Sequence, residues 1–259
     1  MNQFVFSSPR FPASPRAYLF ASGKGGSGKS TLCAGIAAAL ALSGRRVVAW
    51  DADLLMRNLD IYTGLYENAL YDLSDVLMGR AEPEEALTPH PEIPGFSLLA
   101  APAKKIEVSE EDMRLLSKKL LASCDYLLVD APAGIGASFG LAAAAADRAI
   151  VVSTADLSSV GDAARCAEEL DGAGYKKLFL AANRVSPREI GRGFGINLDR
   201  MIDRVGLPLI GFVREDRTIL RLKQDVSALM RRKKPTPAAR DLSDIARRLT
   251  GERVPLPLR

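Results

Sequence analysis

The sequence predicts an α/β fold, a doubly wound and mostly parallel sheet flanked by helices, in a single domain. From Tyr18 onward, short apolar stretches typical of buried strands alternate with longer helical patterns. A glycine-rich segment stands between the first of these strands and the first helix. The chain has 259 residues, which is enough for one large core.

Each predicted element follows from its local pattern. Apolar stretches predict strands over residues 17–21, 46–50, 95–101, 126–129, 148–153, 177–182 and 209–213. Helical patterns predict helices over residues 32–42, from Ser109 onward, and over residues 218–230 and 238–249. Residues 61–94 look helical at first and then loop-like, because four prolines interrupt the pattern.

These elements predict three parts of the chain. Residues 1–16 are expected to be a flexible N-terminal arm, residues 17–250 the domain, and residues 251–259 a C-terminal tail. His90 is the only histidine, and it stands between two prolines. We expect it to be an exposed loop residue, which leaves no histidine for a Ser-His-Asp triad.

The segment 22–31 matches the phosphate-loop pattern G-x-x-x-x-G-K-[ST], with a strand before it and a helix after it. Its glycines let successive backbone N–H groups point at one anion. Lys29 can reach the β and γ phosphates, and the Ser30 hydroxyl can bind Mg²⁺. The segment therefore predicts a site for a magnesium nucleotide, formed by Gly25, Gly26, Ser27, Gly28, Lys29, Ser30 and Thr31.

A second lysine, Lys24, lies inside this loop. The residues KGGSGKST, 24–31, resemble the deviant Walker A motif of the MinD/ParA ATPases. The resemblance implies a P-loop NTPase fold, hydrolysis of ATP with Mg²⁺, and a homodimer in which Lys24 reaches the nucleotide of the partner subunit. It places Lys24 and Lys29 among the catalytic residues.

Acidic residues follow two of the predicted strands. Asp51 and Asp130 each end an apolar stretch, which places their carboxylates at the same sheet edge as the phosphate loop. The segments DADLLMRNLD (51–60) and DAPAGIG (130–136) resemble the two switch segments of MinD-like proteins. The match implies that Asp51 and Asp130 support the metal's water shell and that Asp53 orients the attacking water. Asn58 either shapes the first switch or caps a helix.

The resemblance extends to the base site with some departures. Asn183, followed by Arg184, stands where the family's asparagine recognises adenine, although an asparagine at a strand end can also simply form a turn. Arg214 replaces the usual proline; it either stacks on the base or reshapes its pocket. Gly161 replaces an arginine on a helix that borders the family's dimer and partner surface, and Asp162 is expected to pair with Lys24.

Charge is unevenly distributed. The net charge is +4, but residues 214–259 hold thirteen Lys and Arg against six Asp and Glu. The run 231–234 is either a solvated turn or a contact with an acidic surface such as DNA or anionic lipid. The tail 251–259 contains two prolines and predicts no amphipathic membrane helix.

The cysteines and the hydropathy of the sequence indicate the cellular compartment that we expect. Three widely spaced cysteines predict neither a zinc site nor a disulfide framework, as in a cytoplasmic protein. No apolar run is long enough for a transmembrane segment.

Three functions are therefore considered. The first is a MinD-like ATPase in the spatial regulation of cell division or a related positioning process, such as septum placement or flagellar number. It would work with an unidentified regulatory partner, in the cytoplasm or at the inner face of the membrane. The second is a ParA-like partition ATPase that binds DNA without sequence preference. The third is a nucleotide-gated binding protein with little hydrolysis.

Overall fold

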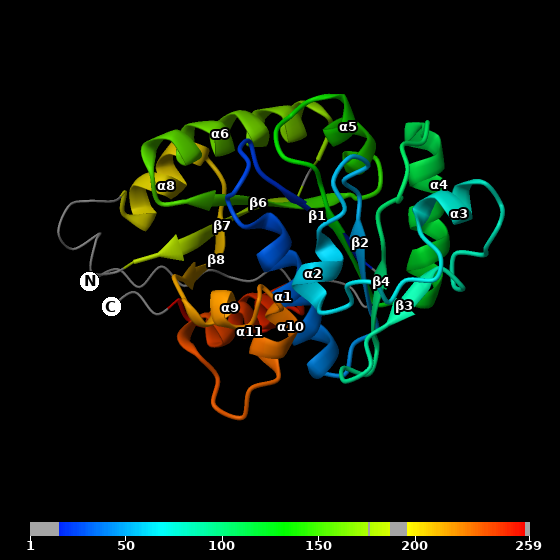
Figure 1. The fold of residues 1–259 in the computed structure, drawn as a ribbon. Coiled ribbons are helices and arrows are strands. Elements are labelled where there is room, and N and C mark those ends of the chain that lie inside the picture. Colours follow the sequence, from blue (N-terminus) through cyan, green and yellow to red (C-terminus); the bar gives the residue numbers. More distant parts are fainter. Residues whose placement is uncertain (1–15, 176, 187–195, 257–259) are drawn as a thin grey trace.

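The computed structural model describes residues 16–175, 177–186 and 196–256 (Figure 1). Its centre is an eight-stranded sheet in the order β3-β4-β2-β5-β1-β6-β7-β8, parallel except for the β3–β4 pair. The strands are β1 (Arg16–Ala21), β2 (Val47–Asp51), β3 (Leu87–Pro89), β4 (Phe96–Leu99), β5 (Tyr126–Asp130), β6 (Arg148–Thr154), β7 (Lys177–Val185) and β8 (Leu209–Arg214).

Helices cover both faces of this sheet (Figure 1). One face carries α3 (Leu73–Leu77), α4 (Glu110–Ser123), α5 (Ala137–Ala143), α6 (Leu157–Gly172) and α8 (Leu198–Val205). The other carries α1 (Lys29–Leu42), α2 (Leu59–Thr63), α9 (Thr218–Arg221), α10 (Val226–Met230) and α11 (Pro237–Leu249).

Side chains of the central strands alternate between the two resulting cores. In β1, Leu19 packs into the core under α4 and α6, whereas Phe20 packs into the core under α1 and α11. Both side chains are fully buried, as period-two alternation requires for a strand covered on both faces. The predicted doubly wound, single-domain fold is therefore confirmed.

The register of the sheet positions the site. Asp51, the last residue of β2, lies opposite Asp130, the last residue of β5. On the other side of β5, Asp130 lies opposite Phe20 near the end of β1. Because the carboxyl ends of parallel strands meet at one edge, the segments that follow β1, β2 and β5 converge there.

The segment 61–94 differs from its prediction. It contains two short helices, α2 and α3, and also the strand β3, where a loop was expected. β3 pairs antiparallel with β4 at the edge of the sheet. Pro89 is tolerated in this edge strand because the position of the N–H that proline lacks points away from the hydrogen bonds to β4.

The predicted single helix over residues 218–230 is also wrong. The structure breaks it into α9 and α10. Lys223 and Gln224 have left-handed φ values of 52° and 69°, and the Asp225 side chain then caps α10 by accepting from the N–H of Ala228. The break turns Val226 and Leu229 into the core beside α1.

His90 is buried, not exposed as the sequence indicated. Its Nδ1 accepts the backbone N–H groups of Glu92 and Ile93, so the ring proton of the neutral imidazole lies on Nε2. Nε2 donates to Ser227 Oγ at 2.9 Å, and Ser227 Oγ donates to Asp225 Oδ1 at 2.7 Å. This chain of polar groups joins the β3–β4 segment to α10.

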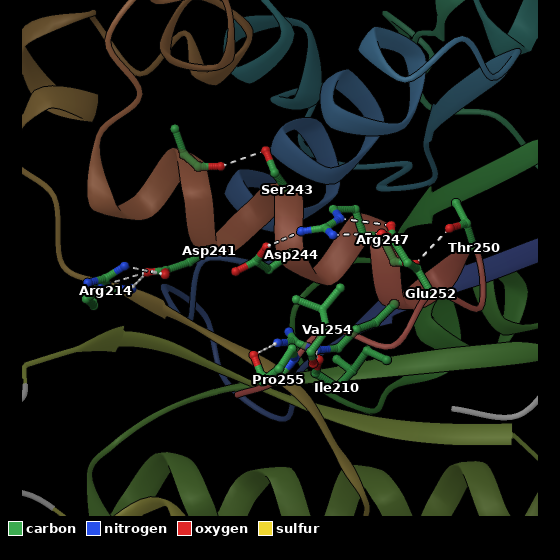
Figure 2. Close-up of polar contacts among 12 residues, drawn as sticks. Ile210, Arg214, Asp241, Ser243, Asp244, Arg247, Thr250, Glu252, Val254 and Pro255 are labelled. Atoms are coloured by element: carbon green, nitrogen blue, oxygen red, sulfur yellow. Dashed lines mark hydrogen bonds and ion pairs between the residues drawn. The ribbon is translucent and has the colours of Figure 1, made fainter. Parts of the chain in front are cut away.

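The C-terminal helix α11 is held against the sheet by polar contacts as well as by its predicted apolar face (Figure 2). Arg248 donates to the carbonyl groups of Ile210, Val254 and Pro255. Residues 251–256 form no helix, and they fold back along α11 through these bonds. Strand β1 begins at Arg16, so residues 1–15 of the predicted arm, like residues 257–259 of the tail, lie outside the described residues.

In the described part of the chain, no helix has the length and apolar character needed to cross a membrane.

Replacing the hydroxyl in the buried polar chain tests its contribution to stability. We expect Ser227→Ala to lower the free energy of unfolding by about 1–3 kcal/mol, because it removes two buried hydrogen bonds, one with His90 Nε2 and one with Asp225 Oδ1. Urea denaturation measures this difference. In the matched control Ser243→Ala, the lost hydroxyl donates only to a carbonyl of its own helix (Figure 2), so the change should stay within about 0.5 kcal/mol. Equal effects of the two substitutions would contradict the role given to Ser227.

Candidate nucleotide-binding site

The phosphate loop joins β1 to α1 through left-handed glycines. Gly26 has a φ of 80° and Gly28 a φ of 92°, and Gly28 is the N-cap residue of α1. Residues other than glycine rarely adopt these φ values, which explains the glycines at both positions. The turn leaves the N-terminal N–H groups of α1 open to an anion.

The phosphate loop is supported by contacts with β7 and α6. The amide nitrogen of Asn183 donates to the Ser27 carbonyl at 2.8 Å, and a Cβ at Gly28 would lie 2.0 Å from that nitrogen. On the other side, a Cβ at Gly23 would lie 2.1 Å from the Asp162 carbonyl oxygen. Side chains at these two glycines would therefore displace the loop from its supports.

A cavity of about 340 Å³ opens above the loop. It brings together most of the predicted site residues, namely Gly25, Gly26, Gly28, Lys29, Ser30, Thr31, Asp51, Asp53, Asp130 and Arg184. Three predicted residues do not line it. Lys24 is exposed on the loop, Ser27 is buried within it, and Asn183 lies beneath it.

The two strand-end carboxylates are almost completely buried. Burial, followed by the charge of Asp130, raises the pKa of Asp51 to about 7. Burial also raises the pKa of Asp130, although the charge of Lys29 and a hydrogen bond with the Ser30 side chain oppose this rise. Two carboxyl groups thus lie side by side where added positive charge would stabilise the ionised form of both.

The residues fit a magnesium ion held mainly by water and phosphate. Asp130 Oδ1 is buried and has no hydrogen-bond partner, and Ser30 lies beside this carboxylate. In the described ranges, no cluster of three or more His, Cys, Asp or Glu side chains could form a metal cage by itself. Mg²⁺ commonly keeps several waters and binds through few protein ligands plus nucleotide phosphates.

Asp51 also holds the segment that follows β2. Its Oδ2 accepts the N–H groups of Asn58 and Leu59 at 3.0 Å each, at the start of α2. Asn58 is the N-cap residue of α2, in agreement with the helix-capping alternative, but its side chain makes no capping bond and the Asp51 carboxylate accepts the N–H groups instead. Asp53 Oδ1 accepts the N–H groups of Leu55 and Met56, which forms a tight turn beside the cavity.

Two other expectations are corrected. Asp162 has its ion pair with Arg165, at 3.9 Å, and in the described part of the chain no ion pair involves Lys24. Arg214 forms a two-pronged ion pair with the buried Asp241 (Figure 2), with Nε–Oδ2 and Nη2–Oδ1 distances of 2.8 and 2.6 Å. Its guanidinium group is therefore held by α11, and Arg214 is not among the residues that line the cavity.

Some residues of the cavity were not predicted from the sequence. Met56, Tyr62, Ala131 and Ala133 also line it. Met56 and the two alanines lie inside the predicted switch segments, so only their contact with the cavity was missed. Tyr62 lies beyond the first switch, and no pattern in the sequence marked it.

Comparison with known proteins agrees with this site. A family model for the CobQ/CobB/MinD/ParA nucleotide binding domain matches residues 18–227. The septum site-determining protein MinD of Synechocystis is 35% identical over 242 residues, which are 93% of this chain and 91% of that protein. MinD of Bacillus subtilis is 33% identical over 244 residues, which are 93% and 91% of the two chains.

Solved structures show the same similarity. A MinC:MinD cell division complex of Aquifex aeolicus contains a chain that aligns with a TM-score of 0.87 and 33% identity, over 93% of this chain and 98% of that one. MinD of Pyrococcus horikoshii complexed with Mg-ADP aligns with a TM-score of 0.80 and 26% identity, over 91% and 96%. The chain therefore belongs to the MinD/ParA family of P-loop nucleotide-binding proteins, among its MinD-like members.

Proposed function

We propose that this protein binds MgATP, hydrolyses it and uses nucleotide-dependent dimerisation as a switch in the spatial regulation of cell division or a related positioning process. The observation that carries the proposal is the cavity in which a phosphate loop faces Asp51, Asp53 and Asp130. The MinD relatives are septum site-determining proteins, which supports the cellular role.

The residues of the cavity suggest how turnover works. Backbone N–H groups of the loop and the Lys29 ammonium group hold the phosphates and neutralise charge that develops on them. Ser30, with Asp51 and Asp130 behind it, would hold hydrated Mg²⁺, which would supply electrostatic stabilisation when bound. Asp53 orients the attacking water. The contribution of the protein is then positioning and electrostatics.

Asn183 links the base site to the phosphate loop in this proposal. Its amide nitrogen already donates to Ser27, and in the described residues no hydrogen bond reaches its carbonyl oxygen. That oxygen is an acceptor suited to the amino group of adenine. Arg184, the next residue of β7, lines the cavity, and in this proposal it forms the base-side end.

Exposed apolar side chains around the cavity favour a second copy of the chain as partner. Leu55 and Met56 in the first switch are 71% and 64% exposed, Ile135 after β5 is 41% exposed, and Leu157 at the start of α6 is 71% exposed. Such residues around one site indicate a surface that is covered in an assembly. We propose that a partner subunit covers them and that Lys24 reaches its nucleotide.

A regulatory protein is the further partner that we propose. The Aquifex relative is described in a complex with MinC. In this chain, Gly161 presents no side chain on α6, and a Cβ there would meet nothing within 4 Å. The partner surface thus differs from the pattern noted in the sequence, and the identity of the partner follows from binding experiments rather than from the family.

The basic run before α11 supports contact with an acidic surface. Arg231 pairs with Glu92, whereas Arg232, Lys233 and Lys234 are exposed and form no ion pair among the described residues. On α9, Leu220 is 71% exposed between Arg217 and Arg221. Basic residues around an exposed leucine favour an anionic membrane over DNA. We propose that the protein works in the cytoplasm, at the inner face of the membrane.

The phosphate-loop lysine tests turnover. We expect Lys29→Ala to weaken MgATP binding by about 10-fold to 150-fold, because a charge-assisted contact contributes about 1.5–3 kcal/mol, and to abolish phosphate release. Calorimetry and a phosphate-release assay measure these effects. The control Lys233→Ala, outside the cavity, should behave as the wild type. Unchanged phosphate release in Lys29→Ala would contradict the proposed mechanism. A wild-type protein that binds MgATP but releases no phosphate would support the nucleotide-gated alternative.

Lys24 separates nucleotide binding from dimerisation. We expect Lys24→Ala to keep its affinity for MgATP within about threefold, since the residue lies outside the cavity of its own subunit, and to remain monomeric with ATP. Light scattering with and without ATP measures the mass. A Lys24→Ala dimer that forms with ATP as readily as the wild type would refute the sandwich arrangement.

The basic run distinguishes the two candidate surfaces. With ATP, we expect the wild type to sediment with vesicles of anionic lipid, and Arg232→Glu/Lys233→Glu/Lys234→Glu to lose at least about tenfold in affinity, at roughly 1 kcal/mol for each residue. Neutral vesicles are the control. Salt-sensitive binding to DNA, with no binding to anionic vesicles, would instead favour the partition ATPase.

A further inference from the structure

Tyr62 is a cavity residue that the family motifs leave without a role. It lies in α2, beyond the first switch, and lines the same cavity as Lys29, Thr31 and Arg184. Its ring is half-buried and packs against the apolar core around α1. In the described part of the chain its hydroxyl forms no hydrogen bond, so the one polar atom of the side chain has no protein partner.

Two opposite charges act on this hydroxyl. Burial, followed by the negative charge of Asp130, raises the pKa of Tyr62, while the positive charge of Arg184 acts in the opposite direction. The phenol therefore stays protonated at neutral pH and can donate a hydrogen bond. It is within electrostatic range of both the metal-side carboxylate and the cation at the base-side end of the cavity.

The helix that carries Tyr62 is held by hydrogen bonds at its start and is closely packed at its end. At its start, Asp51 accepts the N–H groups of Asn58 and Leu59. At its end, Gly64 has a φ of 71°, and a Cβ there would lie 2.7 Å from Asp225 Oδ2 at the start of α10. The phenol is thus presented on a short but anchored helix, and little conformational freedom remains to be lost on binding.

We propose that the hydroxyl of Tyr62 donates a hydrogen bond to a phosphate oxygen of the bound nucleotide. The inference rests on the proposed function, because it requires that the cavity binds a nucleotide. The Tyr62 hydroxyl, which has no partner among the described residues, would thus bind the phosphates that Lys29 and Thr31 hold. It would do so between the charges of Asp130 and Arg184. Through this contact, α2 would respond directly to the bound phosphates. It is already linked to the cavity by Asp51, which accepts the N–H groups at its start.

Removing only the hydroxyl tests this contact. We expect Tyr62→Phe to weaken binding of MgATP by about threefold to tenfold, the loss of one hydrogen bond of ordinary strength. It should weaken binding of magnesium tripolyphosphate by the same factor, because the contact is to phosphate. Isothermal titration calorimetry with both ligands measures the two ratios. The matched control is Tyr66→Phe, which alters a 59% exposed tyrosine just beyond α2 and should change neither.

The outcomes separate this inference from the proposed function. Affinities of Tyr62→Phe equal to those of the wild type for both ligands would refute it. Weaker binding of MgATP with unchanged binding of tripolyphosphate would also refute it, since the contact would then be to the ribose or the base. A wild-type chain that binds neither ligand would refute the nucleotide function itself, and circular dichroism with urea denaturation confirms that the compared variants are folded.

Discussion

Two buried carboxylates at neighbouring strand ends are the constraint on which this structure depends. Asp51 and Asp130 are register partners in β2 and β5, and each is almost fully buried. Burial and repulsion by Asp130 raise the pKa of Asp51 to about 7, so ionising both carboxyl groups without a nearby cation lowers the stability of the protein. The features that relieve this cost are the positive charge of Lys29, the hydroxyl of Ser30 and any cation that enters the cavity. The site is therefore built to gain free energy from a bound metal.

The same constraint connects the cavity with the rest of the chain. Asp51 accepts three backbone N–H groups, those of Asp53, Asn58 and Leu59, so one carboxylate both faces the cavity and holds the first switch with α2. At its other end, α2 contacts α10 through Gly64 and Asp225. A change of charge in the cavity thus acts on a helix whose neighbours are the basic C-terminal elements. This physical continuity is a basis for coupling nucleotide state to a distant surface, provided that α2 has two arrangements.

The sequence predicted those parts of the molecule that depend on local pattern. Strand ends such as Asp51 and Asp130 were found because a buried parallel strand needs a continuous apolar run and its end is abrupt. Where a residue's environment depends on distant segments, the prediction failed. His90 looks like a loop residue between prolines, yet Ser227, 137 positions away, accepts its hydrogen bond. The ion pair of Arg214 with Asp241 of α11 was likewise not foreseen. Tyr62 carried no signal, since an aromatic residue on a short helix is usually part of the core.

The phosphate loop and the output surfaces differ in how strongly physics restricts their sequence. Phosphate recognition by backbone N–H groups requires left-handed residues at fixed positions, and Gly28 is restricted further because Asn183 occupies the space of its missing side chain. In the proposed function, a partner or a membrane would be contacted by exposed side chains such as Leu157 or Lys233, whose spacing no backbone geometry dictates. A substitution at an open position such as Gly161 would change that surface without disturbing the fold, because a Cβ there meets nothing within 4 Å. The loop and its carboxylates consequently define the chemistry of this protein far more narrowly than they define the surface on which it acts.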